Sequence, residues 1–178
     1  MISLKKILRE LSESDTQRCL SKIQQKQFRL IGAGDNGRVY AIDGEDKVFK
    51  ITKEQDEYEV ATIIVDRYNE FTTFIPVYYV DGKNMYIMAN ASEISLQMKK
   101  EIDLFLKEFA VFARNEGGEV SIFDFLRNND AFNPKLINFL TTLKTDIDKL
   151  QIPEFELDLD FRSDNVMIWN GNMVLVDW

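Results

Sequence analysis

The length of 178 residues, with 45% hydrophobic and 29% charged residues, fits a globular protein with a substantial core. A formal net charge of −8 argues against a protein that binds nucleic acid or anionic membranes by general charge attraction. Because the sequence has no histidine and one cysteine, it excludes Ser-His-Asp catalysis, Cys-His catalysis and Cys/His zinc sites within this chain. The single cysteine and the lack of a long apolar run predict a cytoplasmic protein without a membrane segment.

Residues 1–26 are expected to form a helical extension of one or two helices. Apolar residues recur there at helical spacing: Ile2, Leu4, Ile7, Leu8, Leu11, Cys19, Leu20 and Ile23. We expect this extension to pack on the first lobe of the domain. A helix that binds a partner is the alternative.

Three glycines with the spacing Gly-x-Gly-x-x-Gly follow a strand-like run: Gly32, Gly34 and Gly37. Dinucleotide-binding folds share this spacing, but there the glycines open a helix. Here the β-prone run Arg-Val-Tyr-Ala-Ile follows, and Asp43-Gly44 is typical of a hairpin turn. The sequence therefore predicts a glycine-rich hairpin and a third strand over 47–52, which carries Lys50.

The next segment, residues 54–91, predicts one helix and two further strands. Glu57 lies on the apolar face of the helix expected over 54–68, because apolar residues follow it at +3, +4, +7 and +8. The alternative to Glu57 is Glu59, which projects about 200° away around the helix. The apolar runs 74–80 and 85–91 are joined by Asp-Gly-Lys-Asn, which predicts another hairpin. Beyond them, helical patterns cover 92–114, 121–130 and 135–150, and their Met and Phe residues are expected in the core: Met98, Phe105, Phe109, Phe112 and Phe139.

A polar loop and a hairpin close the sequence. The apolar runs 166–169 and 173–176 flank Asn170-Gly171, a strong hairpin signal. Since a two-stranded ribbon brings its ends together, we expect Asn165 and Asp177 to face each other. With Asp160 five residues before Asn165, these oxygen ligands suit a hard cation such as Mg²⁺ and a phosphorylated ligand.

The segment Asp160-Phe-Arg-Ser-Asp-Asn165 resembles the catalytic loop of protein kinases, and Val-Asp177-Trp178 resembles their metal-binding Asp. The Asp-Trp pair is closer to aminoglycoside-type phosphotransferases, since protein kinases carry Phe-Gly after that Asp. The loop is also similar to that of phage kinases. The resemblance implies an α+β, two-lobed kinase-like fold with ATP at the hinge.

In that fold, residues 27–91 form an N-lobe of five antiparallel strands with one inserted helix. Residues 92–178 form a reduced helical C-lobe with the catalytic loop and hairpin. The resemblance also implies a role for each matching residue. Asp160 accepts the hydroxyl proton, Arg162 neutralises the transferred phosphoryl group, and Lys50, held by Glu57, positions the phosphates of ATP. Asn165 and Asp177 bind Mg²⁺.

The remaining nucleotide-binding positions implied are Gly32, Gly34, Gly37, Val39, Val48, Met88 and Ala89. We also expect Lys50 to add little to the stability of the fold, because it would point from a strand into a cleft.

The sequence as printed ends one residue after Asp177, before the segments with which protein kinases dock peptides. We therefore expect a docked macromolecule, or a second copy of this chain, to complete the site. The resemblance most directly implies an ATP- and Mg²⁺-dependent Ser/Thr protein kinase of minimal size. The alternatives are an inert kinase-like module that binds and modulates a host or partner protein, and a small-molecule phosphotransferase of the aminoglycoside type.

Overall fold

The computed structural model describes residues 4–117, 120–127, 129, 131–150 and 161–177. The chain divides into two compact units. The first unit holds Met1–Asn69 and Pro76–Asn90, and the second holds Glu70–Ile75 and Ala91–Trp178. Within the described residues, no helix is both long enough and apolar enough to cross a membrane.

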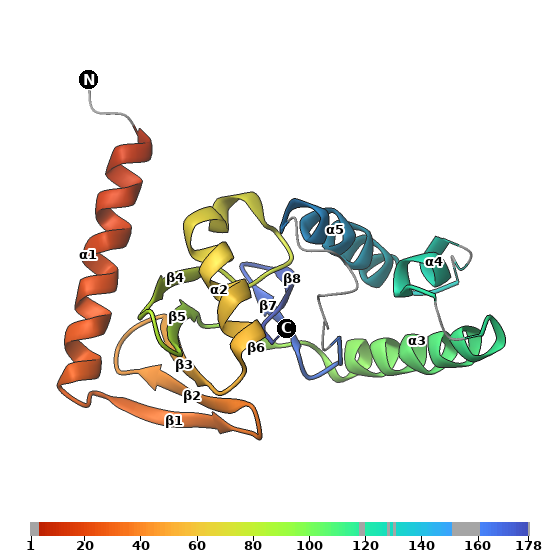
Figure 1. Cartoon of the computed structure of the whole chain (residues 1–178), viewed down its shortest axis with the longest axis horizontal. Helices are drawn as coiled ribbons and strands as arrows, with labels where there is room; N and C mark the ends of the chain where they lie inside the picture. Colours follow the sequence, from red (N-terminus) through yellow and green to blue (C-terminus); the bar gives the residue numbers. More distant parts are fainter. Residues whose placement is uncertain (1–3, 118–119, 128, 130, 151–160, 178) are drawn as a thin grey trace. The chain divides into compact units, whose positions relative to one another are not determined.

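A five-stranded antiparallel sheet forms the centre of the first unit (Figure 1). Its strands are β1 (Phe28–Ala33), β2 (Gly37–Ile42), β3 (Lys47–Thr52), β4 (Val77–Val80) and β5 (Met85–Ala89). They lie in the order β1-β2-β3-β5-β4. Helix α2 (Gln55–Arg67) and the short 3₁₀ helix η1 (Tyr68–Glu70) come between β3 and β4 in the chain. The predicted α+β fold class, with five antiparallel strands and one inserted helix, is confirmed.

Helices cover both faces of this sheet. The N-terminal segment forms a single helix, α1 (Leu4–Gln24), whose Cys19 is fully buried in a cluster with Phe49 and Ile87. On α2, Glu57 contacts Lys50 and the hydroxyl group of Tyr86. Successive side chains of a strand point to opposite faces, so α1 and α2 lie on opposite sides of β3. This arrangement explains why five of the six residues of β3 are buried.

The described part of the second unit contains three helices and a small three-stranded sheet. The helices are α3 (Leu96–Asn115), α4 (Ile122–Arg127) and α5 (Pro134–Leu150). The strands, in sheet order, are β6 (Ser92–Glu93), β7 (Val166–Trp169) and β8 (Asn172–Leu175). An aromatic cluster joins α3 to α4 and consists of Phe105, Phe109, Phe112, Phe125 and Phe132.

The β7–β8 hairpin has the turn that its sequence predicts. Asn170 and Gly171 both have positive φ, 48° and 82°, as a two-residue type I′ turn requires. The predicted helix over 92–114, by contrast, begins only at Leu96. Ser92 and Glu93 pair with β7, and the Ser95 side chain accepts a hydrogen bond from the Met98 amide and caps the helix.

Residues 70–75 belong to the second unit. The strand that was predicted over 74–80 therefore begins only at Val77. Leu175 donates a backbone hydrogen bond of 2.7 Å to Thr73, and the fully buried carboxylate of Asp146 accepts from both amides of Thr72 and Thr73. Burial alone would raise the pKa of the Asp146 carboxyl group. Hydrogen bonds from Lys149 and the two threonines outweigh that effect, and the pKa lies below its ordinary value.

A cluster of ion-paired side chains connects α1 to the turn between β2 and β3. The Glu45 carboxylate accepts two hydrogen bonds of 2.8 Å from the Arg18 guanidinium and lies 2.6 Å from the Lys22 amino group. The Glu45 side chain is only 4% exposed. Hydrogen bonds from Arg18 and then Lys22 lower its pKa from 4.5 to about 2.

We therefore expect Glu45→Gln to lower the free energy of unfolding at neutral pH by about 1 kcal/mol. Because the folded-state pKa is depressed, the contribution of Glu45 is complete above pH 4.5 and is lost as the pH falls toward 2. Urea unfolding at a series of pH values should show the two proteins converging in acid. Asp46→Asn, at the exposed neighbour, is the matched control and should change stability less. A Glu45→Gln deficit that stays constant with pH would contradict this assignment.

Candidate functional site

The glycine-rich segment connects two antiparallel strands. The Gly34 amide donates a 3.0 Å hydrogen bond to the Gly37 carbonyl, which closes the turn between β1 and β2. This geometry excludes the strand-to-helix turn of dinucleotide-binding folds. At Gly37 a Cβ atom would lie 2.5 Å from the Ile51 carbonyl oxygen, whereas no atom lies within 4 Å of a Cβ built at Gly34. The close approach of β3 therefore requires glycine at position 37, and Gly34 leaves room for a ligand.

Lys50 and Glu57 form a buried ion pair in the first unit. The Lys50 Nζ atom lies 2.6 Å from Glu57 Oε1, and the two side chains are 5% and 2% exposed. Lys50 stands directly opposite Val39 in the β2–β3 register, so it lies beside the glycine hairpin. Two predicted residues from β3 and α2 thus meet, although their role in nucleotide binding stays a prediction.

Two further residues hold Glu57, and both were missed by the sequence analysis. The Thr52 hydroxyl donates to Glu57 Oε2 at 2.7 Å, and the Tyr86 hydroxyl donates to Oε1. Thr52 lies two residues after Lys50, on the same face of β3. Strand periodicity therefore carried a signal for Thr52. Tyr86 pairs with Lys50 across β3 and β5, a register that the sequence does not specify.

The predicted adenine-contacting positions lie on the same sheet. Val48 is 3% exposed and stands opposite Met88, which is 6% exposed. The Ala89 amide donates a 3.0 Å hydrogen bond to the Pro76 carbonyl, so this donor is already used within the first unit. An adenine base would have to bind through other backbone groups of this segment.

In the second unit, the hairpin brings its two ends together. The Val176 amide donates a 2.9 Å hydrogen bond to the Asn165 carbonyl, which places Asn165 one residue from Asp177 across the ribbon. Asn165 is 8% exposed and Asp177 is partly buried. Arg162 is exposed and follows the buried Phe161, whose ring stacks on Phe139. The predicted catalytic Asp160 lies outside the described residues.

The oxygen donors at this end of the hairpin fit a hard cation. Asn165 and Asp177 supply one amide and one carboxylate, and Mg²⁺ commonly takes one or two such ligands together with phosphate oxygens and water. In the described part of the chain, no group of three or more His, Cys, Asp or Glu residues is arranged to hold a metal ion. A cation bound here would therefore depend on ligand oxygens, as in nucleotide-bound Mg²⁺.

No protein-family model and no curated protein match the sequence. Among solved structures, the streptomycin–ATP–APH(2")-IIa ternary complex aligns with 99% of this chain and 71% of that chain. APH(2")-IIa is an aminoglycoside phosphotransferase. The sequence identity is 17% and the TM-score is 0.39, values at which the likeness assigns no function.

The buried pair leads to a test that separates stability from chemistry. The expectation that Lys50 adds little to stability does not suit a buried, paired lysine. Lys50→Met leaves Glu57 buried without its cation, so we expect the free energy of unfolding to fall by about 3 kcal/mol. The double variant Lys50→Met/Glu57→Gln removes both charges and should recover most of that loss, as a double-mutant cycle from chemical denaturation would show.

Additive losses in that cycle would contradict the pairing. If Lys50 binds phosphate, the recovered double variant should still be unable to bind ATP. Recovery of both stability and ATP binding would show that Lys50 has no role beyond the fold.

Proposed function

We propose that this protein is a kinase-like phosphotransferase that uses ATP with Mg²⁺. The observation that carries the proposal is the ion pair between Lys50 and Glu57, buried beside a glycine-rich hairpin. In protein kinases a strand lysine, paired with a helix glutamate, holds the phosphates of ATP. The chain has this pair on corresponding elements, the third strand and the inserted helix.

The energetics favour a functional reason for this pair. Moving two charges from water into a protein interior costs several kcal/mol per ion, and apolar residues of similar size often stabilise a fold as well. Val48 lies two residues before Lys50, on the same face of β3, and is buried, so an apolar residue would suit the position of Lys50. Binding of phosphate oxygens by Lys50 would explain why this buried position carries a positive charge. The ion pair with Glu57 would then hold the Lys50 ammonium group in a fixed position.

The remaining polar residues supply the other parts of a phosphoryl-transfer site. Asn165 and Asp177 would hold Mg²⁺, which neutralises phosphate charge during transfer. We assign to Arg162 the neutralisation of the transferred group, and to Asp160 the acceptance of the acceptor's hydroxyl proton. Lys50, fixed by Glu57, orients the phosphates for in-line attack.

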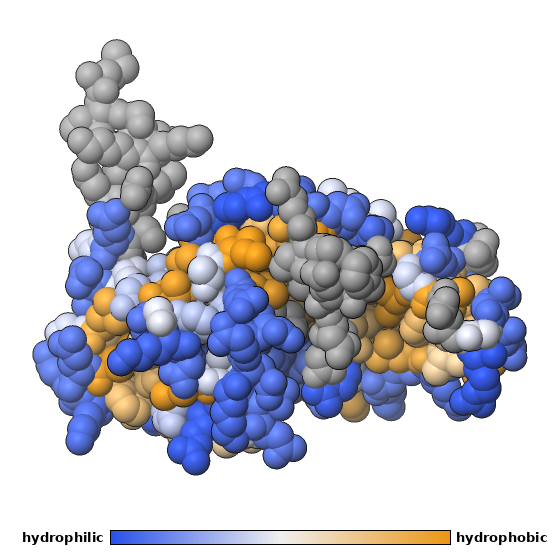
Figure 2. All heavy atoms as spheres, in the orientation of Figure 1, coloured by the Kyte–Doolittle hydropathy of each residue, from blue (hydrophilic) through white to orange (hydrophobic). Residues whose placement is uncertain are grey.

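For the acceptor, we propose a Ser/Thr side chain of a protein. A groove of about 440 Å³ on α3 and α4 supports this choice, since Leu104 and Val111 beside it are 48% and 51% exposed. Figure 2 shows apolar surface over this part of the molecule. Exposed apolar residues grouped on one helix suit a macromolecular partner. The same groove would serve the alternative, an inert kinase-like module that binds a partner protein.

The test is ATP binding and phosphoryl transfer with a matched pair of variants. Thermal unfolding with Mg²⁺ and ATP at about 100 times Kd should show about 2.7 kcal/mol of stabilisation, and ATP alone should give much less. Asp177→Asn should abolish the Mg²⁺-dependent part. Asp164→Asn is the control, because Asp164 lies on the same loop but forms a surface ion pair with Lys99. It should behave as wild type.

Labelled ATP then identifies the acceptor. We expect label on proteins of a cell extract and little on short Ser/Thr peptides or on an aminoglycoside. Label on the aminoglycoside alone would favour a small-molecule phosphotransferase, and ATP binding without transfer would favour the inert module. No stabilisation by Mg²⁺ and ATP together would refute the proposed phosphotransferase.

A further inference from the structure

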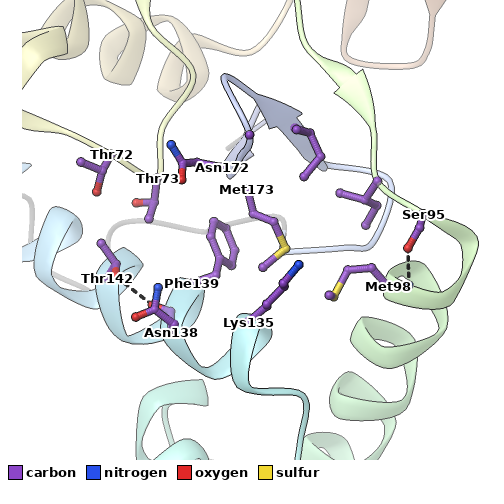
Figure 3. Close-up of a pocket in the computed structure, with 13 residues that line it drawn as sticks. Thr72, Thr73, Ser95, Met98, Lys135, Asn138, Phe139, Thr142, Asn172 and Met173 are labelled. Atoms are coloured by element: carbon purple, nitrogen blue, oxygen red, sulfur yellow. Dashed lines mark hydrogen bonds between the residues drawn. The ribbon is translucent and has the colours of Figure 1, made fainter.

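A cavity of about 650 Å³ lies within the second unit (Figure 3). Its walls come from four segments of that unit: residues 72–73, the β6–α3 junction, the first half of α5, and the turn end of the β7–β8 hairpin. The volume falls within the range of small-molecule sites in proteins.

The cavity lies apart from the two residues that are proposed to bind Mg²⁺. It is lined by Ile168, Gly171, Asn172 and Met173, at the turn of the hairpin. The residues proposed to bind Mg²⁺ belong to the open end of the same ribbon. A strand rises about 3.3 Å per residue, so Asn165 and Ile168 are about 10 Å apart along β7. The cavity and the proposed Mg²⁺ ligands therefore lie at opposite ends of the ribbon.

One part of the wall is apolar and adaptable. It consists of Ile94, Met98, Phe139, Ile168 and Met173. Phe139 is 4% exposed, and Figure 3 shows its ring among the side chains of Thr73, Met173 and Lys135. Thioether side chains adjust to ligands of irregular shape. Met98, which the sequence analysis placed in the core, is instead half-buried and lines this cavity.

The polar part of the wall includes Lys135, an exposed residue near the start of α5. Lys135 is the charged residue among the described lining residues, and none of these is acidic. Within the described part of the chain, the Lys135 ammonium group has no hydrogen bond or ion pair. Thr73 already donates its hydroxyl hydrogen to Asp146, and Thr142 donates to the Asn138 carbonyl. These two hydroxyls can only accept hydrogen bonds from a ligand, whereas the Lys135 ammonium group can donate hydrogen bonds and carries a positive charge.

We infer that this cavity binds a small organic anion, with one carboxylate on an apolar body. The carboxylate pairs with Lys135, and the apolar body packs against Phe139, Met98 and Met173. Among the described lining residues, no acidic side chain would offset the repulsion between Lys135 and a cationic ligand. A fully apolar ligand would gain nothing from this exposed charge.

The methionines provide the test. The chain has 6 Met residues, of which Met98 and Met173 line the cavity, while Met85 and Met88 lie in the first unit. We would label the Met methyl groups with ¹³C and titrate the full chain with 2-naphthoate, without nucleotide. The methyl signals of Met98 and Met173 should shift together, and those of Met85 and Met88 should not. The neutral analogue 2-naphthalenemethanol should bind about fivefold more weakly.

The charge is tested by a matched pair of variants. Lys135→Gln should weaken 2-naphthoate binding about fivefold and leave the neutral alcohol unchanged. Lys100→Gln, an equal change of charge at an exposed position outside the cavity, should alter neither. Absence of shifts at Met98 and Met173, or equal binding of acid and alcohol, would overturn the inference. Because ATP is absent, this result does not depend on the proposed phosphotransferase function.

Discussion

The buried ion pair between Lys50 and Glu57 is the constraint on which the first unit depends. Two charges with little access to water are tolerable only if they meet each other and their remaining bonding capacity is satisfied. Here the hydroxyl groups of Thr52 and Tyr86 donate hydrogen bonds to the two oxygens of the Glu57 carboxylate. The pair therefore fixes α2 against β3 and β5 at one place. Because α1 packs on the opposite face, this buried ion pair lies on the side of the sheet that α2 covers.

The second unit depends on a different constraint, the hydrogen-bonded hairpin and its neighbours. The type I′ turn sets the register of β7 and β8, which in turn places Asn165 close to Asp177. The buried carboxylate of Asp146 then fixes the segment beside β8 through the amides of Thr72 and Thr73. One short ribbon thus contributes to two places, the proposed metal ligands at its open end and a cavity at its turn.

Local sequence patterns predicted the parts of this structure that depend on local physics. Asn170-Gly171 specified a hairpin turn because both residues tolerate positive φ, and the apolar spacing after Glu57 predicted its inward-facing position. Contacts between distant residues were not predictable in this way. Asp146 and Thr73 are 73 residues apart, and no periodicity joins them. The start of α3 was also missed, because the pairing of Ser92 with β7 depends on tertiary contact.

Paramagnetic broadening by Mn²⁺ tests whether Asn165 and Asp177 hold the metal ion of bound ATP, because Mn²⁺ accepts the same oxygen ligands as Mg²⁺. With ATP present, we expect strong broadening of the Asn165, Val166 and Asp177 amide signals. The turn at Gly171 lies beyond Trp169, which is itself about 13 Å from Asn165 along the strand, so its signals should be broadened much less. Broadening spread over exposed acidic residues, with no preference for Asn165 and Asp177, would show that these two residues do not hold the metal ion.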